Sequence, residues 1–362
     1  MTGRRPTQVR IASWPHWYAP NPYLELFYGA LQPHGVVHIR HFDPETDPTV
    51  AVSSVDAFHL HWAYPYWRDG QPGPATQAVR VARLAHQLRA LRRAGVPLLW
   101  TVHNLAHHEG DRLPDRLAYR LLHRMADLRI FHSRWARDEA RSRYGETGGD
   151  MVVMPHGNYD GAFPDPAPGD VTRKALGVSS DARLLLCFGQ LRRYKGFDVA
   201  LEALRHLPRG RFHLVVAGRS VDGTGEALLR AAAHRRGVLV QPGDVEPQRL
   251  SDLLAAADVV LLPYRSVTGS GALLAALTFG CGVVASDLPY FREILDAHPG
   301  AGRLAPVEDP RALARAIDTF LARPAHERER AARQAAESYA WPRVVEPVAR
   351  WITGNVRTIG SR

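Results

Sequence analysis

Short runs of aliphatic residues alternate along the chain with longer stretches in which apolar residues recur at helical spacing. Continuous apolar runs such as LLLCF and VVLLP are typical of strands that are buried on both faces of a sheet. Because helical stretches separate these runs, the pattern predicts an α/β protein with parallel sheets. We predict strands at residues 8–14, 36–42, 57–62, 97–105, 128–133, 151–155, 183–188, 212–217, 238–241, 259–263 and 282–286.

A stretch rich in proline, glycine and aspartate at residues 155–170 divides these strands into two series. This composition is typical of a linker, and 362 residues is a length that suits two domains. We therefore predict two Rossmann-like, doubly wound domains that face a cleft, at residues 1–160 and 161–340, with a C-terminal helix at 341–362 that packs back on the first domain. Ligands of such sheets bind beyond the carboxyl ends of the strands.

One uncharged stretch, residues 266–286, is long enough to cross a bilayer. Its serine, threonine and glycine residues gather at both ends, which favours a glycine-rich turn, a buried helix and a buried strand instead. No apolar stretch follows the basic N-terminus, so we expect no secretory signal. Two cysteines cannot form a disulfide framework, and a reducing cytoplasm is the expected compartment.

The chain carries 46 basic and 36 acidic residues, a net charge of +10, and its basic residues include two lysines. Two stretches of predicted helix, at residues 80–93 and 116–124, carry many arginines. These are Arg80, Arg83, Arg89, Arg92, Arg93, Arg116, Arg120 and Arg124. Arginine-rich helical faces attract anionic lipid headgroups, and they are equally typical of a solvated surface. We keep both interpretations, so the inner face of a membrane is a candidate partner. Nucleic acid is not expected, because no binding motif accompanies the charge.

Gly189, Arg192 and Lys195 follow the first strand of the second series. A glycine lets the backbone turn sharply, and the basic side chains then lie where an anionic ligand would bind. In a chain that uses arginine for nearly every positive charge, a lysine between Tyr194 and Gly196 indicates a need for a compact charge. The alternative is a solvated basic loop.

A second candidate anion site consists of small residues before an apolar helix: Thr268, Gly269, Ser270 and Gly271. The start of a helix offers unpaired N–H groups and the positive end of the helix dipole, which together favour phosphate. An ordinary capped turn is the alternative. The turn at Gly218 is a weaker candidate, and neither a P-loop nor a dinucleotide-binding glycine motif is present.

His103 stands at the end of the fourth strand of the first series, close to Glu109. A base that removes a proton from a sugar hydroxyl needs a pKa near neutrality, which histidine supplies, and Glu109 could orient it or replace it. His103 and His107 have the spacing of metal ligands on a helix, but they flank a strand exit, so we predict no metal site. Polar loop residues without a role are the alternative.

Two aromatic segments, WPHWYAPNPY and HLHWAYPYW, also follow predicted strands. Flat aromatic faces beside histidine and asparagine are typical of sugar-binding sites, whereas aromatic residues of the core are the alternative. The candidate acceptor-binding residues are Trp14, Asn21, Tyr23, His61, Trp62 and Asn104.

The order and spacing of four stretches, NPYLELFYGAL, TVHNLAHHEG, FGQLRRYKG and PYRSVTGSGALLAAL followed by FGCGVVASDLPYFREIL, resemble the GT-B glycosyltransferases of the family 4 type. The likeness covers nearly the whole chain. It is strongest to bacterial enzymes that build exopolysaccharide and glycolipid glycans, several of them GDP-mannose-dependent β-mannosyltransferases. The resemblance implies a nucleotide-sugar donor on the second domain, an acceptor on the first, and no metal cofactor.

The resemblance also implies roles for single residues. Lys195 matches a lysine that contacts the donor diphosphate, and Arg192 would supply the charge of an arginine that the family places at Gln190. Glu293 matches the acidic residue of a "Glu-Ile" turn, and His103 matches a histidine near the transferred sugar.

One departure from the family pattern bears on the stereochemistry. Retaining members carry two glutamates separated by seven residues, and the alignment places these positions at Val267 and Ala275. The second glutamate usually binds ribose hydroxyls, so the nucleoside contacts must differ here. The diphosphate would be held by backbone N–H groups of residues 266–271, and inversion with His103 or Glu109 as base is favoured.

The sequence therefore predicts an enzyme that moves a hexose from a nucleoside-diphosphate sugar, with GDP, UDP or dTDP as the nucleotide, to an acceptor hydroxyl. A sugar-nucleotide epimerase on the same scaffold and a non-catalytic sugar- or lipid-binding protein remain open as alternatives. A glycoside hydrolase is disfavoured, because it needs two carboxylates that face one bond, and the strand ends offer histidine and basic residues instead.

Overall fold

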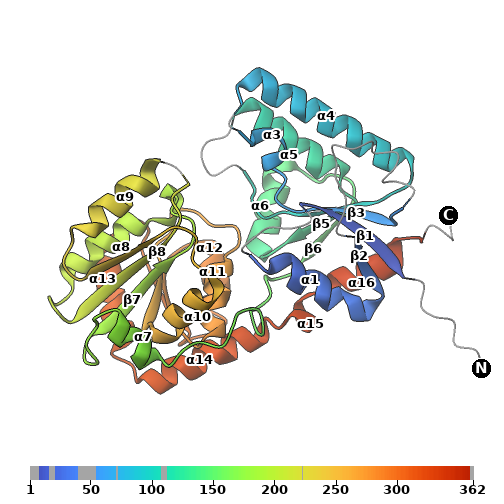
Figure 1. The fold of residues 1–362 in the computed structure, drawn as a ribbon. Coiled ribbons are helices and arrows are strands. Elements are labelled where there is room, and N and C mark those ends of the chain that lie inside the picture. The colour runs from blue at the N-terminus through green and yellow to red at the C-terminus, as the bar shows by residue number, and fades with distance from the viewer. Residues whose placement is uncertain are drawn as a thin grey trace, which may run out of the picture. The chain divides into compact units, whose positions relative to one another are not determined.

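The computed structural model describes residues 8–15, 21–39, 54–70, 72–106, 112–221 and 223–358. The chain forms two compact units, the first made of Met1–Gly157 with Trp341–Arg362 and the second of Asn158–Ala340. Each unit holds one six-stranded sheet in which every pairing is parallel, with helices packed on it (Figure 1). The predicted α/β fold class is confirmed.

The sheet of the first unit has the strand order β2-β1-β3-β4-β5-β6. Its strands are β1 (Val9–Trp14), β2 (Val36–Ile39), β3 (Ala57–Leu60), β4 (Leu98–Thr101), β5 (Leu128–Phe131) and β6 (Asp150–Val153). Its helices are α1 (Tyr23–Leu31), the 3-10 helix η1 (Gln32–His34), α3 (Pro65–Arg68), α4 (Pro74–Arg93), α5 (Leu113–Met125), α6 (Arg134–Tyr144), α15 (Trp341–Val344) and α16 (Glu346–Asn355). The last two helices come from the C-terminal part of the chain, and Trp351 anchors them by donating a 2.7 Å hydrogen bond to Asp150.

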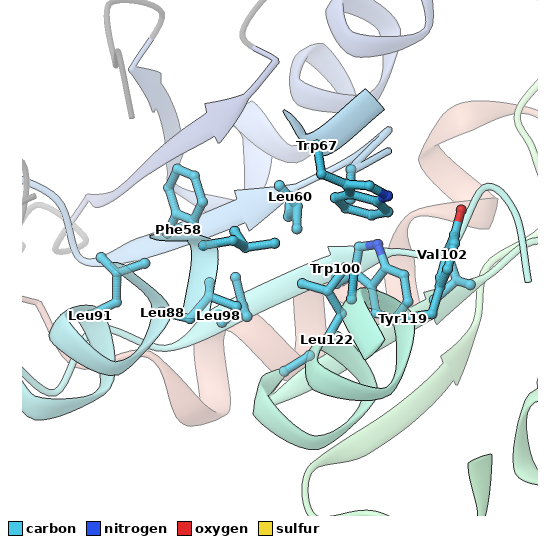
Figure 2. Packing of buried hydrophobic residues seen from close by; sticks show 14 of the residues in the cluster. Phe58, Leu60, Trp67, Leu88, Leu91, Leu98, Trp100, Val102, Tyr119 and Leu122 are labelled. Carbon is cyan, nitrogen blue, oxygen red and sulfur yellow. The ribbon is translucent and has the colours of Figure 1, made fainter. Parts of the chain in front are cut away.

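The core of the first unit lies between its sheet and the helices α4 and α5 (Figure 2). Leu84, Leu88 and Leu91 recur at helical spacing on α4 and are buried. They pack with side chains of β3 and β4, among them Phe58 and Trp100. Burial of this apolar stripe fixes α4 on the sheet, and the opposite face of the helix is left to its arginines.

The sheet of the second unit has the order β12-β11-β10-β7-β8-β9. Its strands are β7 (Arg183–Phe188), β8 (Phe212–Gly218), β9 (Val238–Pro242), β10 (Val259–Leu262), β11 (Val283–Ser286) and β12 (Gly302–Ala305). Its helices are α7 (Gly169–Ala175), η2 (Arg193–Lys195), α8 (Phe197–Ala203), η3 (Leu204–His206), α9 (Gly223–Ala233), α10 (Pro247–Ala256), α11 (Gly271–Thr278), α12 (Pro289–Leu295), α13 (Pro310–Leu321) and α14 (Ala325–Ser338). The winding reverses between β7 and β10, so the loops after these two strands form the edge where doubly wound sheets bind ligands.

The structure differs from the pattern-based prediction in two strands and agrees with it in the uncharged stretch. The strand β12 was not predicted, because it is a four-residue edge strand whose residues are mostly half-buried or exposed and so lack a continuous apolar run. The predicted strand at 97–105 ends at Thr101, and residues 40–42 of the strand predicted at 36–42 lie outside the described residues. The uncharged stretch at 266–286 comprises a loop, α11 and β11, and none of the described helices is long and apolar enough to cross a membrane.

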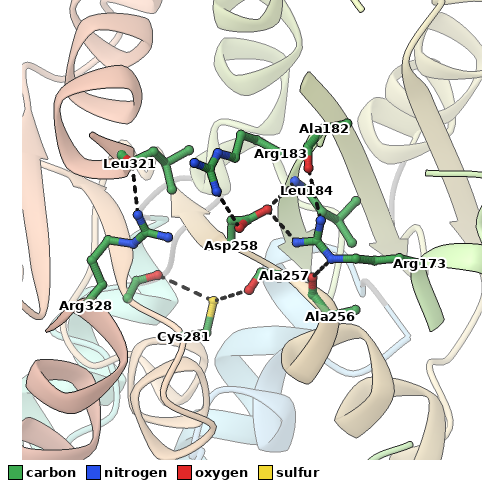
Figure 3. Close-up of polar contacts among 11 residues, drawn as sticks. Arg173, Ala182, Arg183, Leu184, Ala256, Ala257, Asp258, Cys281, Leu321 and Arg328 are labelled. Carbon is green, nitrogen blue, oxygen red and sulfur yellow. Dashed lines mark hydrogen bonds and ion pairs between the residues drawn. The ribbon is translucent and has the colours of Figure 1, made fainter. Parts of the chain in front are cut away.

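A carboxylate clamps the amino-terminal edge of the second sheet, opposite the ligand edge. Asp258 precedes β10 and accepts hydrogen bonds from Arg173 at 2.5 Å and from the backbone N–H of Leu184 at 2.7 Å (Figure 3). Arg183 lies 3.4 Å from the same carboxylate. The side chain of Asp258 is 12% exposed, so these contacts are largely shielded from water and connect α7, β7 and β10.

We predict that Asp258→Ala lowers the free energy of unfolding of the second unit by about 3 kcal/mol, because it leaves the guanidinium of Arg173 without its partner. Chemical denaturation followed by circular dichroism measures this change. The control is Asp318→Ala, which removes an exposed carboxylate of α13. Equal stability of the two variants would contradict the assigned role.

Candidate functional site

The loops that follow β7 and β10 lie side by side at the switch point of the second unit. The backbone N–H of Arg265 donates a 2.7 Å hydrogen bond to the carbonyl oxygen of Tyr194, and its guanidinium donates at 2.6 Å to that of Arg193. The parallel pairing of β7 with β10 makes this approach possible. The two predicted anion-binding segments, around Lys195 and around Ser270, therefore belong to one edge of one sheet.

The guanidinium of Arg265 is fully engaged by acidic side chains. It donates to both carboxylate oxygens of Asp198, at 2.7 and 3.0 Å, and to Glu308 at 2.7 Å. These hydrogen bonds raise the pKa of Arg265. Arg265 therefore fixes the two loops to each other, and it also occupies the two carboxylates.

Lys195 is the positive charge at this edge that lacks a counter-ion. Its Nζ lies 5.7 Å from the ring centre of Tyr264 and 5.9 Å from that of Phe197, and no carboxylate among the described residues pairs with it. Burial lowers the pKa of Lys195 to about 8, and the charge of Arg192 acts in the same direction. An ammonium group held in this way gains stability when an anion binds next to it.

Two glycines allow Lys195 to lie directly against the backbone. Gly189 has φ +101°, and a Cβ at this position would lie 2.7 Å from the Nζ of Lys195. Gly218, at the end of the neighbouring strand, has φ +154°, and its Cβ would lie 1.9 Å from the carbonyl oxygen of Gly189. Any other residue at these positions would push the strands and the ammonium group apart.

The N-terminus of α11 completes this edge of the second sheet. The hydroxyl of Ser270 accepts a 3.2 Å hydrogen bond from the N–H of Leu273 and so caps the helix. The backbone N–H groups of residues 268, 269, 271 and 272 donate to no backbone carbonyl in the described part of the chain. Such N–H groups at the start of a helix are suited to oxygen atoms of a phosphate. The side chains of Thr268 and Ser270 are buried, so it is the backbone of this segment that would contact a ligand.

The two remaining candidates of the second unit lie beside this edge. Arg192 is half-buried and donates to the side-chain oxygen of Gln190 at 3.2 Å, so it remains close to the loop that holds Lys195. Glu293 is half-buried on α12, which follows β11, the neighbour of β10. Burial raises the pKa of Tyr339 to about 12, and the negative charge of Glu293 contributes.

Histidines gather at the carboxyl ends of the strands of the first unit. They lie within β2 and β3 or follow β3, β4, β5 and β6, and they are His38, His59, His61, His103, His132 and His156. Tyr23 stands among them, with ring centres 5.0 to 5.8 Å from His61, Trp62, His103, His132, His156 and Trp341. Within the described ranges, no three histidine, cysteine or acidic side chains could hold a metal ion.

Two of the residues predicted to bind the acceptor are buried in the structure. Tyr23 is 0% exposed and His61 is 1% exposed, and rings that follow β3, β4, β5 and β6, together with Trp341 of α15, surround Tyr23. Asn21 caps the start of α1 by accepting a 3.0 Å hydrogen bond from the N–H of Tyr23. Three other predicted acceptor-binding residues are half-buried and so can contact a ligand: Trp14, Trp62 and Asn104.

His103 is half-buried and stacks on Trp62, with ring centres 4.1 Å apart and planes 10° from parallel. Its Nε2 lies 3.4 Å from the Nδ1 of His61. Burial, followed by the nearby rings of His132 and His156, lowers the pKa of His103 well below its ordinary value. The ring is therefore neutral at pH 7, but it is a weaker base than a histidine with the near-neutral pKa expected from the sequence. Glu109 and His107 lie outside the described residues.

Sequence reasoning missed several of the buried side chains, including Tyr28, His59, His132 and His156. Burial lowers the pKa of His59 and His156 to about 3 and that of His132 to about 4. The histidines among them share one feature that is visible in the sequence, their position at the end of successive strands. The predicted site includes only His61 and His103 of this series.

We predict that the first unit loses stability as the pH falls from 7.5 to 5. Four buried rings, at His59, His123, His132 and His156, have folded-state pKa values of about 3 to 4. In the unfolded chain they titrate near 6.5, so the unfolded state binds more protons below that pH and is favoured. At pH 5 each of these rings lowers the free energy of unfolding of the first unit by about 2 kcal/mol. All eight tryptophans belong to the first unit, so tryptophan fluorescence during denaturation measures this unit.

His123 supplies the test variant for this prediction. Neither of its ring nitrogens has a hydrogen-bond partner, and the ring packs between Tyr144 and Trp100. His123→Phe should recover about 2 kcal/mol at pH 5 and change little at pH 7.5. His86→Gln, at an exposed position of α4, is the control and should leave the acid transition unchanged. An equal acid transition in both variants would rule out His123 as a source of it.

Comparison with known proteins agrees with this architecture. The family model "Glycosyl transferases group 1" matches residues 170–338, and "Glycosyltransferase Family 4" matches residues 81–158. A GDP-mannose:glycolipid 4-beta-D-mannosyltransferase of Xanthomonas campestris is 29% identical over 73% of this chain and 69% of its own length. A D-inositol 3-phosphate glycosyltransferase of Xylanimonas cellulosilytica is 31% identical over 79% of this chain and 69% of its own. The structure of Anabaena HepE with UDP and glucose superposes with a TM-score of 0.69 at 17% identity and covers 96% of this chain and 100% of that one.

Two doubly wound parallel units together with these matches define an enzyme that transfers a sugar from a nucleotide-sugar donor. The chain belongs to the GT-B glycosyltransferases of the family 4 type.

Proposed function

We propose that this enzyme transfers a hexose, with GDP-mannose as the favoured donor, to a hydroxyl of a glycolipid or glycan acceptor, with inversion at the anomeric carbon. The observation that carries the proposal is the ammonium group of Lys195, which has no carboxylate partner among the described residues and lies at the same edge as backbone N–H groups of α11 that have no backbone acceptor there. The preference for GDP-mannose and for a glycolipid acceptor rests on the relative from Xanthomonas campestris. UDP remains the second candidate nucleotide, because HepE was solved with it.

In this proposal the second unit binds the donor through its diphosphate. Lys195 and Arg192 supply positive charge, the N–H groups of residues 268, 269, 271 and 272 donate to phosphate oxygens, and Glu293 contacts the sugar or nucleoside. As the bond from the anomeric carbon to the phosphate oxygen breaks, its electron pair leaves with the nucleoside diphosphate, and the ammonium group stabilises the developing charge. These groups supply the charge that a divalent ion supplies elsewhere, so we propose that transfer requires no metal and proceeds in EDTA.

The first unit provides the acceptor site and the base in this scheme. Neutral His103 takes the proton of the acceptor hydroxyl while its oxygen bonds to the anomeric carbon, and the sugar packs against Trp62, Trp14 and Asn104. Inversion is favoured because the two positions that hold glutamate in retaining relatives are Val267 and Ala275, which are 6% and 2% exposed. Both side chains are apolar and buried, so no carboxylate is available there.

We predict that Lys195→Met weakens binding of GDP about ten- to a hundredfold, because a charge-assisted contact to the diphosphate is lost. Isothermal calorimetry with GDP, UDP and dTDP measures the affinities and identifies the nucleotide. Lys174→Met is the matched control, since it removes the other lysine of the chain, which is exposed on α7.

Transfer itself is measured with GDP-mannose and a glycolipid acceptor, and nuclear magnetic resonance of the product reports the anomeric configuration. His103→Ala should abolish turnover and leave GDP affinity unchanged. Unchanged affinity in Lys195→Met would remove the diphosphate role. Isomerisation of the donor without acceptor would favour an epimerase, and tight nucleotide binding without transfer a non-catalytic protein.

We propose in addition that α4 and α5 dock on an anionic membrane surface at the cytoplasmic face. Leu113 and Leu117 of α5 are 66% and 48% exposed, and Val79 of α4 is 69% exposed. The same two helices carry exposed arginines: Arg83, Arg89, Arg92, Arg93, Arg116, Arg120 and Arg124. Apolar residues among basic ones on one helical face are suited to insertion at anionic headgroups, where a lipid-linked acceptor would be presented.

We predict that replacing Arg116, Arg120 and Arg124 by glutamine weakens binding to phosphatidylglycerol vesicles about a hundredfold, at about 1 kcal/mol for each charge. Vesicle sedimentation measures the change. The control variant replaces the exposed Arg311, Arg315 and Arg330 of the second unit in the same way. Equal losses in both variants would show a general charge effect, and binding of the wild type to phosphatidylcholine alone would contradict the electrostatic account.

A further inference from the structure

A line of hydrogen-bonded side chains leads from Thr101 at the end of β4 through β3 and α1 and returns to His103, two residues after Thr101. The Oγ1 of Thr101 lies 2.9 Å from Nε2 of His59, and Nδ1 of that ring lies 2.9 Å from the phenol oxygen of Tyr28. The same oxygen lies 3.3 Å from Nε2 of His61, whose Nδ1 lies 3.4 Å from Nε2 of His103. We call these five residues the tyrosine–histidine relay.

The relay is buried except at one end. Thr101 and His59 are 0% exposed and His61 is 1% exposed, whereas His103 is half-buried. Burial lowers the pKa of all three histidines, so each ring is neutral at pH 7 and carries one ring proton. A neutral imidazole donates from one nitrogen and accepts at the other. The proton position on each ring therefore dictates that on the next.

The phenol of Tyr28 decides the direction, because it has one proton and contacts two rings, while its third contact, the hydroxyl of Ser13, favours the phenolate and so acts as a donor. The phenol oxygen is 2.9 Å from His59 and 3.3 Å from His61, and O–H donors make shorter hydrogen bonds than N–H donors. Tyr28 therefore donates to His59 and accepts from Nε2 of His61. Nδ1 of His61 then has no proton, and it must accept one from Nε2 of His103.

The ring of Tyr28 is itself held in place. It stacks on His38, with ring centres 3.7 Å apart and planes 6° from parallel. The Nε2 of His38 lies 2.8 Å from the hydroxyl of Ser13 on β1. The ring of His38 therefore holds the phenol of Tyr28 by stacking on it, and the buried rings of His59 and His61 hold its oxygen.

We propose that the tyrosine–histidine relay holds His103 in the tautomer that carries its proton on Nε2, so that Nδ1 keeps a lone pair for the acceptor hydroxyl. The use of that lone pair rests on the proposed function, whereas the tautomer is a property of the protein alone. In transfer, the O–H bond of the acceptor breaks and an Nδ1–H bond forms. The Nε2–H group of the resulting imidazolium still donates to His61, which stabilises the positive charge.

Tyr28, His59 and His61 are positioning residues in this account, and they act through His103. Among the described residues, the other rings close to His103 are Tyr23 of α1, Trp62 after β3, and His132 after β5, with ring centres at 5.1, 4.1 and 5.2 Å. His156, which follows β6, acts on it through charge. None of these rings is an acid that could set the tautomer by itself, so within the described part of the chain the direction comes from the hydrogen bond to His61.

The experiment reads the ring protons directly, in the full chain without substrate. Two-bond proton–nitrogen correlation spectra of protein labelled with ¹⁵N-histidine show which ring nitrogen carries the proton, and His103→Gln assigns the signals of His103. We expect protonated Nε2 and unprotonated Nδ1 at His103 in the wild type. Tyr28→Phe releases His61 from its fixed tautomer, so a form of His103 with protonated Nδ1 should appear. The same variant should lower kcat about tenfold or more with little change in the KM for donor.

Two further variants keep the test decisive. Tyr144→Phe is the control, because its phenol donates a 2.5 Å hydrogen bond to the carbonyl oxygen of Leu105 outside the relay, and it should leave His103 unchanged. If Tyr28→Phe fails to fold, Thr101→Val takes its place. It removes the hydroxyl at the first end of the relay with a side chain of the same shape, and it should shift the tautomers of His59 and His103. A wild-type protein with protonated Nδ1 at His103 would overturn the proposal, as would unchanged ring nitrogens in Tyr28→Phe. Absence of sugar transfer would instead contradict only the proposed function.

Discussion

A positive charge that lacks a counter-ion determines the construction of the ligand edge of the second unit. The ammonium group of Lys195 lies on the backbone of Gly189 and beside the ring of Tyr264, in surroundings that lower its pKa to about 8 because it is buried. Two acidic side chains nearby, Asp198 of α8 and Glu308 after β12, are bound by Arg265 instead. Arg265 thus joins the loops and also keeps these carboxylates away from the lysine, so the charge remains available for an anion.

The histidines at the strand ends of the first unit are uncharged, unlike the lysine of the second unit. The pKa values of these imidazoles are lowered by burial, and the polar atoms of several of these rings contact one another. A buried histidine with one proton must both donate and accept, so a line of such rings defines where the last proton lies. In the proposed function, the second unit supplies a charge for a diphosphate, and the first supplies an orientated lone pair for a hydroxyl.

Much of the fold follows from local patterns. Strands such as LLLCF and VVLLP are recognised because both of their faces are buried, whereas β12 escapes recognition because an edge strand has no such run. Lys195 is recognisable from composition, since the chain otherwise uses arginine. The closure of the site around it by Arg265 is not, because that contact joins residues separated by 72 positions and depends on the pairing of β7 with β10.

The interior of the first unit was the harder part to predict. His61 and Tyr23 look like surface aromatic residues in their segments, yet rings from several strand ends and α15 bury them. This burial depends on the strand order, which places β3 between β1 and β4, and no local spacing encodes it. The same order brings Tyr28, His59 and His61 into contact.

The central claim is that Lys195 is the receptor for a diphosphate, and the number of protons taken up on binding tests it most directly. At pH 8 the free lysine is about half protonated, because its pKa is about 8, and a bound diphosphate should keep it fully protonated. Calorimetry of GDP binding at pH 8, in buffers with different heats of ionisation, should therefore show uptake of about half a proton in the wild type. Binding of GDP without proton uptake would contradict the account.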